Sequence, residues 1–283
     1  MIKKEIPKPI RGFSSVDMHC HSRYSDSFTT LKNMIKKAEK ERFGFALTDH
    51  NTVLGCKIKS KEILLIPGME FSSKEGPHIL TYFQNFNDGK EFYEKFVKKN
   101  KRKNPYSSTR LSAYDYIDKA KEFNAVMSFA HPFVPSQMGI MKSIRRRFVK
   151  EDLLRKINGV EVICGSLTKK MNEKAIDYSI KNNSIITGGS DAHTLKQLGS
   201  VQTFAEASTP AEFLEQVRKK QVRVVGMEFK ISGRASTSLT VVPKNLRYFF
   251  PTLKLKYESM IKKPGSYYWQ RVKESSRRLE KRM

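Results

Sequence analysis

The chain has 283 residues, of which 39% are hydrophobic, and its formal net charge at pH 7 is +26. This length suits one large α/β domain or a barrel with appendages, and no apolar run is long enough to cross a bilayer. Three cysteines without C-x-x-C spacing argue against a disulfide framework, and the first residues lack the apolar core of a signal peptide. We therefore expect a cytoplasmic protein, and the excess of positive charge favours a polyanionic partner.

The first predicted element is a strand that begins near residue 15 and contains the segment D-M-H-C-H at positions 17–21. Because side chains alternate across a strand, Asp17, His19 and His21 are expected to face the same way. Two imidazoles on one strand face can both reach a single cation, so the pattern indicates a metal site. The alternative is a buried strand that contains two histidines by chance.

Strands and helices then alternate over about 225 residues. A helix over 31–42, which we expect Gly44 to end, is followed by strands over 45–50, 63–66 and 78–83. Further helices are predicted over 112–122, 169–181 and 210–219, and further strands over 125–130, 159–163, 184–187 and 222–225. This alternation favours a parallel α/β arrangement, and polar residues at the strand ends favour a barrel over an open sheet. No nucleotide-binding glycine motif is present to argue for the open sheet.

Three segments lie outside this alternation. Residues 1–14 are a lead, and residues 85–110 are a basic insertion within a barrel that we place at 15–225. Residues 226–283 form a C-terminal extension with fourteen Lys or Arg against four Asp or Glu. The extension either packs its aromatics on the barrel or forms a nucleic-acid surface in which aromatics stack on bases. Its aromatic residues include Tyr248, Phe249, Phe250, Tyr257, Tyr267, Tyr268 and Trp269.

All six histidines fall at or beside predicted strand ends, and carboxylates accompany them. The histidines are His19, His21, His50, His78, His131 and His193, and the carboxylates are Asp26, Asp49, Glu70 and Asp191. Imidazoles mixed with carboxylates suit Zn, Mn or Fe better than Ca or Mg. So many donors exceed the needs of one catalytic zinc, and they predict a site with two or three ions.

The ordered motifs H-x-H-S-x-x-S-D, T-D-H-N, P-G-M-E-F-S, A-H-P and G-G-S-D-A-H resemble the PHP (polymerase and histidinol phosphatase) family of metallo-phosphoesterases. The resemblance covers roughly residues 15–225. It implies a distorted (β/α)7 barrel that holds up to three divalent ions.

Position by position, the resemblance implies three metal sites. The first ion would be held by His19, His21, Glu70 and Asp191, and the second by Glu70, His78 and His131. The third would be held by Asp26, His50 and His193. Asp26 is a histidine in some members, and His78 could instead be a core histidine at a strand start. Asp17 and Asp49 are expected to orient ligands, although Asp49 could equally cap a loop.

The expected mechanism follows from the negative charge of a phosphate ester, which repels an attacking hydroxide. Divalent ions lower the pKa of a bound water and neutralise phosphoryl oxygens, so a hydroxide bridging two ions would attack phosphorus in line with the leaving oxygen. Glu70, Asp191 and His193 are the expected catalytic residues.

Cations near the site are candidates for contact with substrate phosphate. Arg23 lies beside Asp26, and Arg145 and Arg146 lie in a segment that follows a strand end, as does the basic run 98–103. The alternative for each is an exposed, solvated side chain. Together they would form an electropositive funnel through which a polynucleotide could enter.

Three functions remain open. The first is hydrolysis of phosphate esters at a nucleic acid 5′ end or on a nucleotide, because the motifs are similar to those of stand-alone members that cleave 3′,5′-nucleotide bisphosphates and trim RNA from its 5′ end. The second is a small-metabolite phosphatase, such as one for histidinol phosphate, which would not need a charge of +26. The third is a non-catalytic nucleic-acid-binding module.

Overall fold

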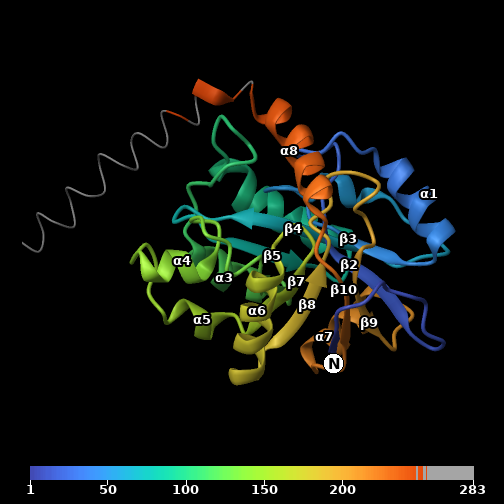
Figure 1. Ribbon diagram of the computed structural model, residues 1–283. Coiled ribbons are helices and arrows are strands. Elements are labelled where there is room, and N and C mark those ends of the chain that lie inside the picture. Colours follow the sequence, from blue (N-terminus) through green and yellow to red (C-terminus); the bar gives the residue numbers. More distant parts are fainter. Residues whose placement is uncertain (247, 251–252, 254–283) are drawn as a thin grey trace, which may run out of the picture.

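The computed structural model describes residues 1–246, 248–250 and 253 (Figure 1). Within these residues, ten strands form one sheet in the order β1-β10-β9-β2-β3-β4-β5-β6-β7-β8. The strands are β1 (Ile2–Lys3), β2 (Ser14–Cys20), β3 (Gly44–Leu47), β4 (Leu65–Ser72), β5 (His78–Tyr82), β6 (Val126–Phe129), β7 (Gly159–Cys164), β8 (Ile185–Gly189), β9 (Val201–Ala205) and β10 (Arg223–Gly226). The α-helices are α1 (Leu31–Glu41), α2 (Phe86–Phe92), α3 (Ala113–Glu122), α4 (Ile140–Arg145), α5 (Leu153–Lys156), α6 (Lys169–Lys181), α7 (Pro210–Arg218) and α8 (Ile231–Leu246).

The sheet curls until its β8 end returns to β2. The backbone N–H of Asp191 donates to His19 O at 2.7 Å, and that of His21 donates to Ala192 O at 2.9 Å. Gly189 permits this approach, because a Cβ at that position would overlap the backbone and Cβ of His19. The barrel-type α/β fold expected from the sequence is therefore confirmed.

The prediction of a parallel arrangement holds for only part of the sheet. Strands β2, β3 and β4 pair in parallel, as do β6, β7 and β8. In contrast, β5 is antiparallel to β4 and β6, and β9 is antiparallel to β2 and β10. The connection 73–77 between β4 and β5 is too short for a parallel crossover, so the pair must be a hairpin.

Several predicted boundaries were wrong, and the strand expected over 45–50 is β3, which ends at Leu47. The strand expected over 63–66 is β4, which extends to Ser72, so Glu70 lies inside a strand rather than after one. The first helix ends at Arg42, whose φ of 58° is left-handed. Gly44 does not end it, but begins β3, where a Cβ would overlap the carbonyl oxygen of Leu64. The helix capped by Ser112, the bounds of α6 and the start of α7 at Pro210 agree with prediction.

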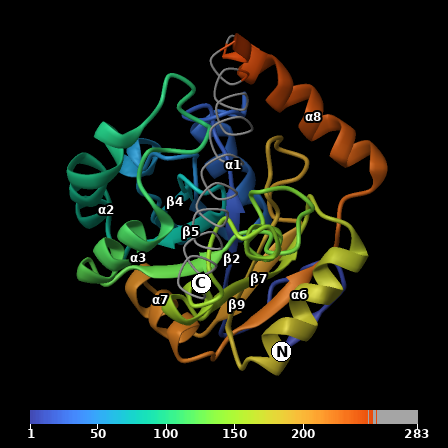
Figure 2. The same ribbon diagram turned by 90° about the vertical axis from the view of Figure 1, so that its left-hand side faces the viewer.

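The helices cover the outside of the sheet and one of its ends (Figures 1 and 2). On α1, Leu31, Met34 and Ala38 pack against a cluster that includes Phe45 and Leu47 of β3. The apolar face of α7, made of Phe213, Leu214 and Val217, packs against a cluster that includes Val16 and Met18 of β2. Because α7 fills the end of the sheet where β2 begins, the opposite end is left for polar side chains.

The three segments placed outside the predicted alternation all contact the rest of the fold, and β1 of the lead pairs in parallel with β10. In the proposed insertion, Phe92 of α2 and the following Val97 are fully buried in the cluster that contains α3. In the proposed extension, the ring of Tyr248 lies 5.8 Å from that of Tyr106, which agrees with packing for this one aromatic. Phe249 and Phe250 are exposed. Tyr257, Tyr267, Tyr268 and Trp269 lie outside the described residues. No helix in the described part of the chain combines the length and hydropathy needed to cross a membrane.

Candidate metal centre

Strand β2 brings the first two histidines into the interior of the curled sheet. His19 and His21 are 0% and 1% exposed, and their Nε2 atoms lie 3.2 Å apart. Two lone pairs, or two N–H groups, would repel each other at this distance. The pair therefore needs a shared proton or a shared cation between the rings.

Glu70 of β4 lies at the centre of the cluster and is 1% exposed. Its two carboxylate oxygens face different imidazoles. Oε1 lies 2.7 Å from Nδ1 of His78 and 3.0 Å from Nε2 of His131. Oε2 lies 3.0 Å from Nδ1 of His50 and 3.4 Å from Nε2 of His21. Burial alone would raise the pKa of Glu70, but attraction to the surrounding imidazoles, His50 first, holds it well below its usual range.

The turn after β8 supplies two further donors. Asp191 has a left-handed φ of 54°, and its Oδ1 lies 3.2 Å from Nε2 of His21. His193 stacks on the His21 ring with centroids 4.4 Å apart, and its Nε2 lies 3.3 Å from Oδ1 of Asp26. Asp26 reaches the cluster from the loop that follows β2, and its Oδ2 lies 3.4 Å from Nε2 of His50.

These donors form overlapping groups that fit a metal cluster. Three groups of mutually close donor atoms consist of proposed ligands, namely His21, Asp26, His50 and His193; His19, His21 and Asp191; and His50, Glu70 and His78. A fourth is His19, Glu161 and Cys164, and His131 joins the site through its contact with Glu70. Three buried atoms of the proposed ligands make no well-aligned hydrogen bond, namely Oδ1 of Asp26 and the Nδ1 atoms of His50 and His131. A buried polar atom without a hydrogen bond needs an explanation, and a cation would provide it for all three. All nine proposed ligands thus lie in one site, while their division among individual ions stays a prediction.

Glu161, which was not among the predicted site residues, holds two of the ligands in place. This side chain of β7 is 1% exposed, and its Oε1 lies 2.9 Å from Nδ1 of His19. Its Oε2 accepts a hydrogen bond from the backbone N–H of His131 at 2.6 Å. The contact with Nδ1 leaves Nε2 of His19 available for a metal. A lone glutamate within the apolar run Val160–Ile163 was the available signal.

Asp17 and Asp49 hold the loops that carry other ligands, in agreement with the orienting role expected for them. Asp17 accepts hydrogen bonds from the backbone N–H and the hydroxyl of Ser190, beside Asp191. Burial raises the pKa of Asp17 to about 6, although these hydrogen bonds oppose the shift. Asp49 accepts from Ser22 and from the hydroxyl of Ser25, beside Asp26.

A cavity of about 430 Å³ opens onto the proposed ligands. Its lining includes Lys74, residues 106–108 of the proposed insertion, and Val241 and Asn245 of α8. Arg23, Arg145 and Arg146, the cations expected to contact substrate, are exposed and do not belong to this lining. Lys74 was not predicted, because it lies in the short hairpin connection that the sequence analysis did not resolve.

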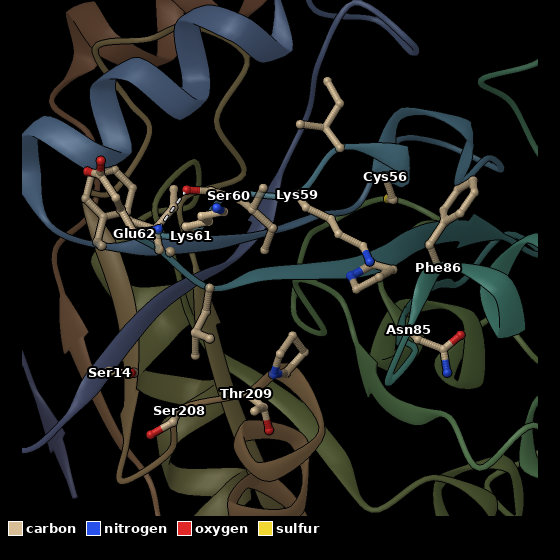
Figure 3. A pocket seen from close by; sticks show the side chains of 18 of the residues that line it. Ser14, Cys56, Lys59, Ser60, Lys61, Glu62, Asn85, Phe86, Ser208 and Thr209 are labelled. Carbon is tan, nitrogen blue, oxygen red and sulfur yellow. Dashed lines mark hydrogen bonds between the residues drawn. The ribbon is translucent and has the colours of Figure 1, made fainter.

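A larger cavity of about 800 Å³ lies at the other end of the sheet (Figure 3). The residues labelled there include Lys59, Lys61, Asn85 and Thr209, which come from loops and helix starts. The lining residues include no histidine, and the carboxylate of Glu39 accepts a hydrogen bond from Ser60 at 2.8 Å. This cavity therefore lacks a donor set for a metal cluster.

Comparisons with known proteins agree with the motifs. A family model described as the PHP domain matches residues 17–185, and one described as PHP-associated matches residues 169–222. An uncharacterised protein of Methanocaldococcus jannaschii is 25% identical over 256 residues, which cover 86% of this chain and 92% of that protein.

The fold is also similar to that of endonuclease Q. The lesion-specific endonuclease Q of Pyrococcus furiosus aligns with a TM-score of 0.57 at 17% identity, covering 75% of this chain and 57% of that one. An endonuclease Q in complex with a 27-mer duplex, with an abasic lesion at its active site, aligns with a TM-score of 0.59 at 18% identity, covering 76% of this chain and 60% of that one. This chain thus corresponds to little more than half of endonuclease Q, and at these identities the likeness extends to the fold alone.

Proposed function

The chain belongs to the PHP domain family of metal-dependent phosphoesterases, and we propose that it hydrolyses phosphate esters of nucleic acid ends or nucleotides. We further propose that it uses two or three ions of Mn, Zn or Fe. The nine ligands would be His19, His21, Asp26, His50, Glu70, His78, His131, Asp191 and His193.

One observation carries this proposal, namely the position of the Glu70 carboxylate. Its oxygens face His78 and His131 on one side and His50 and His21 on the other. A carboxylate between two sets of imidazole donors is suited to bridge two cations. A structural glutamate would need one cationic partner, and it would not need a shell of imidazoles.

The residues of the site have separate tasks in this scheme. Bound divalent ions would supply Lewis acidity, which activates water and neutralises phosphoryl oxygens. Glu70 and Asp191 provide the negative charge that offsets the ions, and Glu161 holds His19 in one orientation. Asp191 and His193 line the cavity, so they are placed to hold or accept a proton beside a bound phosphate. Lys74 adds a positive charge to the wall that the phosphate would pass.

Charge supports a polynucleotide or nucleotide substrate. The net charge of +26 favours association with polyanions in general. Endonuclease Q, which shares the fold, binds a 27-mer duplex substrate with an abasic lesion at its active site. The second candidate, a small phosphomonoester such as histidinol phosphate, is favoured by the cavity volume of about 430 Å³, which lies in the range of small-molecule pockets.

The test compares substrates on protein purified with Mn²⁺. We would offer 5′-phosphorylated RNA and DNA oligonucleotides, a 3′,5′-nucleotide bisphosphate and histidinol phosphate to the wild type and to His19→Ala. Release of mononucleotides or phosphate from the nucleic acid substrates, lost in His19→Ala, is the expected result.

The control is Lys59→Ala, because Lys59 lines the cavity at the other end of the sheet. This variant should retain the wild-type rate. Turnover of histidinol phosphate alone would replace the proposal with the second candidate. Oligonucleotide binding without hydrolysis of any ester would instead identify a binding module.

A further inference from the structure

Helix α8 contacts the site on three sides, although it follows the last strand of the sheet. The guanidinium of Arg234 donates to the carbonyl oxygen of Leu167, beyond β7, at 3.3 Å. Lys244 donates to the carbonyl oxygen of Ser25, beyond β2, at 3.4 Å. Asn245 accepts from the side chain of Asn104 at 3.2 Å. The helix therefore crosses the end of the sheet where the ligands lie (Figures 1 and 2).

A single buried side chain joins α8 to the turn that carries His193. Gln197 is 4% exposed, and its Oε1 accepts from the backbone N–H groups of His193 at 2.9 Å and Thr194 at 3.0 Å. Its Nε2 donates to the carbonyl oxygen of Gly233 at 2.8 Å and to the hydroxyl of Thr237 at 2.6 Å. Both lone pairs and both N–H groups of this amide are thus used.

This arrangement links the position of a proposed ligand to the position of α8. The amide oxygen can face His193 only in an orientation that points the amide nitrogen at Gly233 and Thr237. Without α8, two buried N–H groups of the amide would lose their acceptors, and the side chain would turn toward other partners. The backbone N–H of His193 would then lose its acceptor, while its carbonyl oxygen would still accept from the hydroxyl of Ser27 at 2.8 Å.

The same helix also forms part of the cavity wall. Val241 and Asn245 line the cavity together with residues 106–108. The hydrogen bond from Asn104 to Asn245 joins these two walls. A substrate group in the cavity would therefore contact α8 on one wall and the proposed insertion on the neighbouring wall.

We propose that α8 is an integral part of the metal centre: through Gln197 it positions the turn of His193, and through Val241 and Asn245 it selects substrates by size. In this arrangement Gln197 is a positioning residue, because it acts through His193. The inference rests on the proposed function for the identity of the ligands and deepens it by naming what limits entry.

The first experiment measures Mn²⁺ binding to metal-free, full-length protein. Gln197→Ala should weaken binding of the ion held by Asp26, His50 and His193 by about 10- to 100-fold, as is usual when a residue that orients a ligand is lost. Gln197→Glu keeps an acceptor for the two N–H groups but replaces the amide donors with an oxygen that Gly233 O repels. It should bind Mn²⁺ more tightly than Gln197→Ala, while hydrogen exchange over 231–246 increases in both variants.

The matched control is Gln202→Ala. Gln202 is also buried, at 8% exposure, but its amide donates to the carbonyl oxygen of Gly199 rather than to α8. Wild-type Mn²⁺ affinity and wild-type exchange over 231–246 in Gln197→Ala would overturn the inference. Hydrogen exchange is compared in metal-free protein, so it decides on the link to α8 even if the wild type binds no metal. A wild-type protein that binds no metal would refute the proposed function instead.

The second experiment tests whether α8, as part of the cavity wall, limits the size of the substrate. Val241→Phe should raise KM for a 5′-phosphorylated dinucleotide by about tenfold and leave KM for the smaller p-nitrophenyl phosphate within about twofold, with unchanged Mn²⁺ binding. Leu239→Phe is the control on the same helix, because Leu239 is 77% exposed. Equal changes in KM for the two substrates would show that α8 does not select by size.

Discussion

The two ends of the sheet carry cavities of opposite character. The cavity of about 430 Å³ is surrounded by buried imidazoles and carboxylates whose donor atoms converge. The one of about 800 Å³ is lined by exposed side chains such as Lys59 and Lys61, which extend from a loop (Figure 3). We therefore expect catalysis at the smaller cavity. Charges act strongly on a substrate only where water is excluded and the positions of the charged groups are fixed.

The two ends of the sheet also differ in backbone conformation. At the end with the smaller cavity, left-handed φ angles occur at Asn51, beside His50, and at His131 and Asp191 themselves. At the other end, Arg42 and Lys220 adopt such angles where helices finish. The latter are ordinary helix ends, whereas the former turn ligands inward at residue types that adopt left-handed angles more readily than most.

The largest effect is expected for Glu70→Gln, which retains the size of the side chain and removes its charge. We expect kcat/KM for p-nitrophenyl phosphate to fall roughly 1,000-fold, or about 4 kcal/mol, because the cations would lose their shared carboxylate. Metal content by elemental analysis should fall with it. The same substitution at Glu62, in the larger cavity, should change neither quantity. A loss of activity in Glu62→Gln would break the comparison between the two ends.

A smaller loss is expected for Glu161→Gln. The amide can still contact Nδ1 of His19, but it no longer stabilises an N–H there by charge. Activity or metal affinity should decrease by about 10- to 100-fold. Steady-state kinetics together with Mn²⁺ titration would measure this. An unchanged affinity and rate would mean that Glu161 only fills space in β7.

At the opposite end, Thr209→Ala tests a purely structural contact. Thr209 is the N-cap of α7 and forms a capping box with Glu212. Its loss should lower the free energy of unfolding by about 1 kcal/mol. Chemical denaturation would measure this change, and Mn²⁺ stoichiometry should stay that of the wild type. A changed stoichiometry would indicate that α7 influences the metal centre.

The smallest effect is expected for the double variant Lys59→Glu and Lys61→Glu. Both side chains are exposed and lie in the larger cavity, so salt screens their influence on the metal centre. The rate of oligonucleotide hydrolysis at 0.15 M salt should change by less than about twofold. A larger decrease would show that a polynucleotide also contacts this end of the protein.

Short-range patterns predict the ligands but not their supports. His19, His21, Asp191 and His193 are recognisable because apolar runs end beside them, and runs of this kind depend only on neighbours in sequence. Glu161 is not recognisable as a support, since its role depends on His19, 142 positions earlier. The same holds for Gln197, whose partners in α8 are 36 and 40 positions later.

The fold was predicted in outline for the same reason. Alternating helices and strands indicate a barrel, and α6 was predicted at its observed bounds. Strand β9 was missed because Gln202 and Thr203 interrupt the apolar pattern of Val201–Ala205, and its antiparallel pairing with β2 is set by tertiary contacts. Helix α8 was missed because serines, threonines and Pro243 weaken its helical pattern.

The hydrogen bonds between Asp17 and Ser190 join positions 173 apart in the chain. A ribosome adds about 5–20 residues per second, so about 10 to 30 seconds pass between the synthesis of His19 and that of Asp191. During synthesis, the early histidines therefore meet cellular ions without their later partners. The set of ligands can therefore be completed only late in translation, after β8 and the turn that follows it have been synthesised.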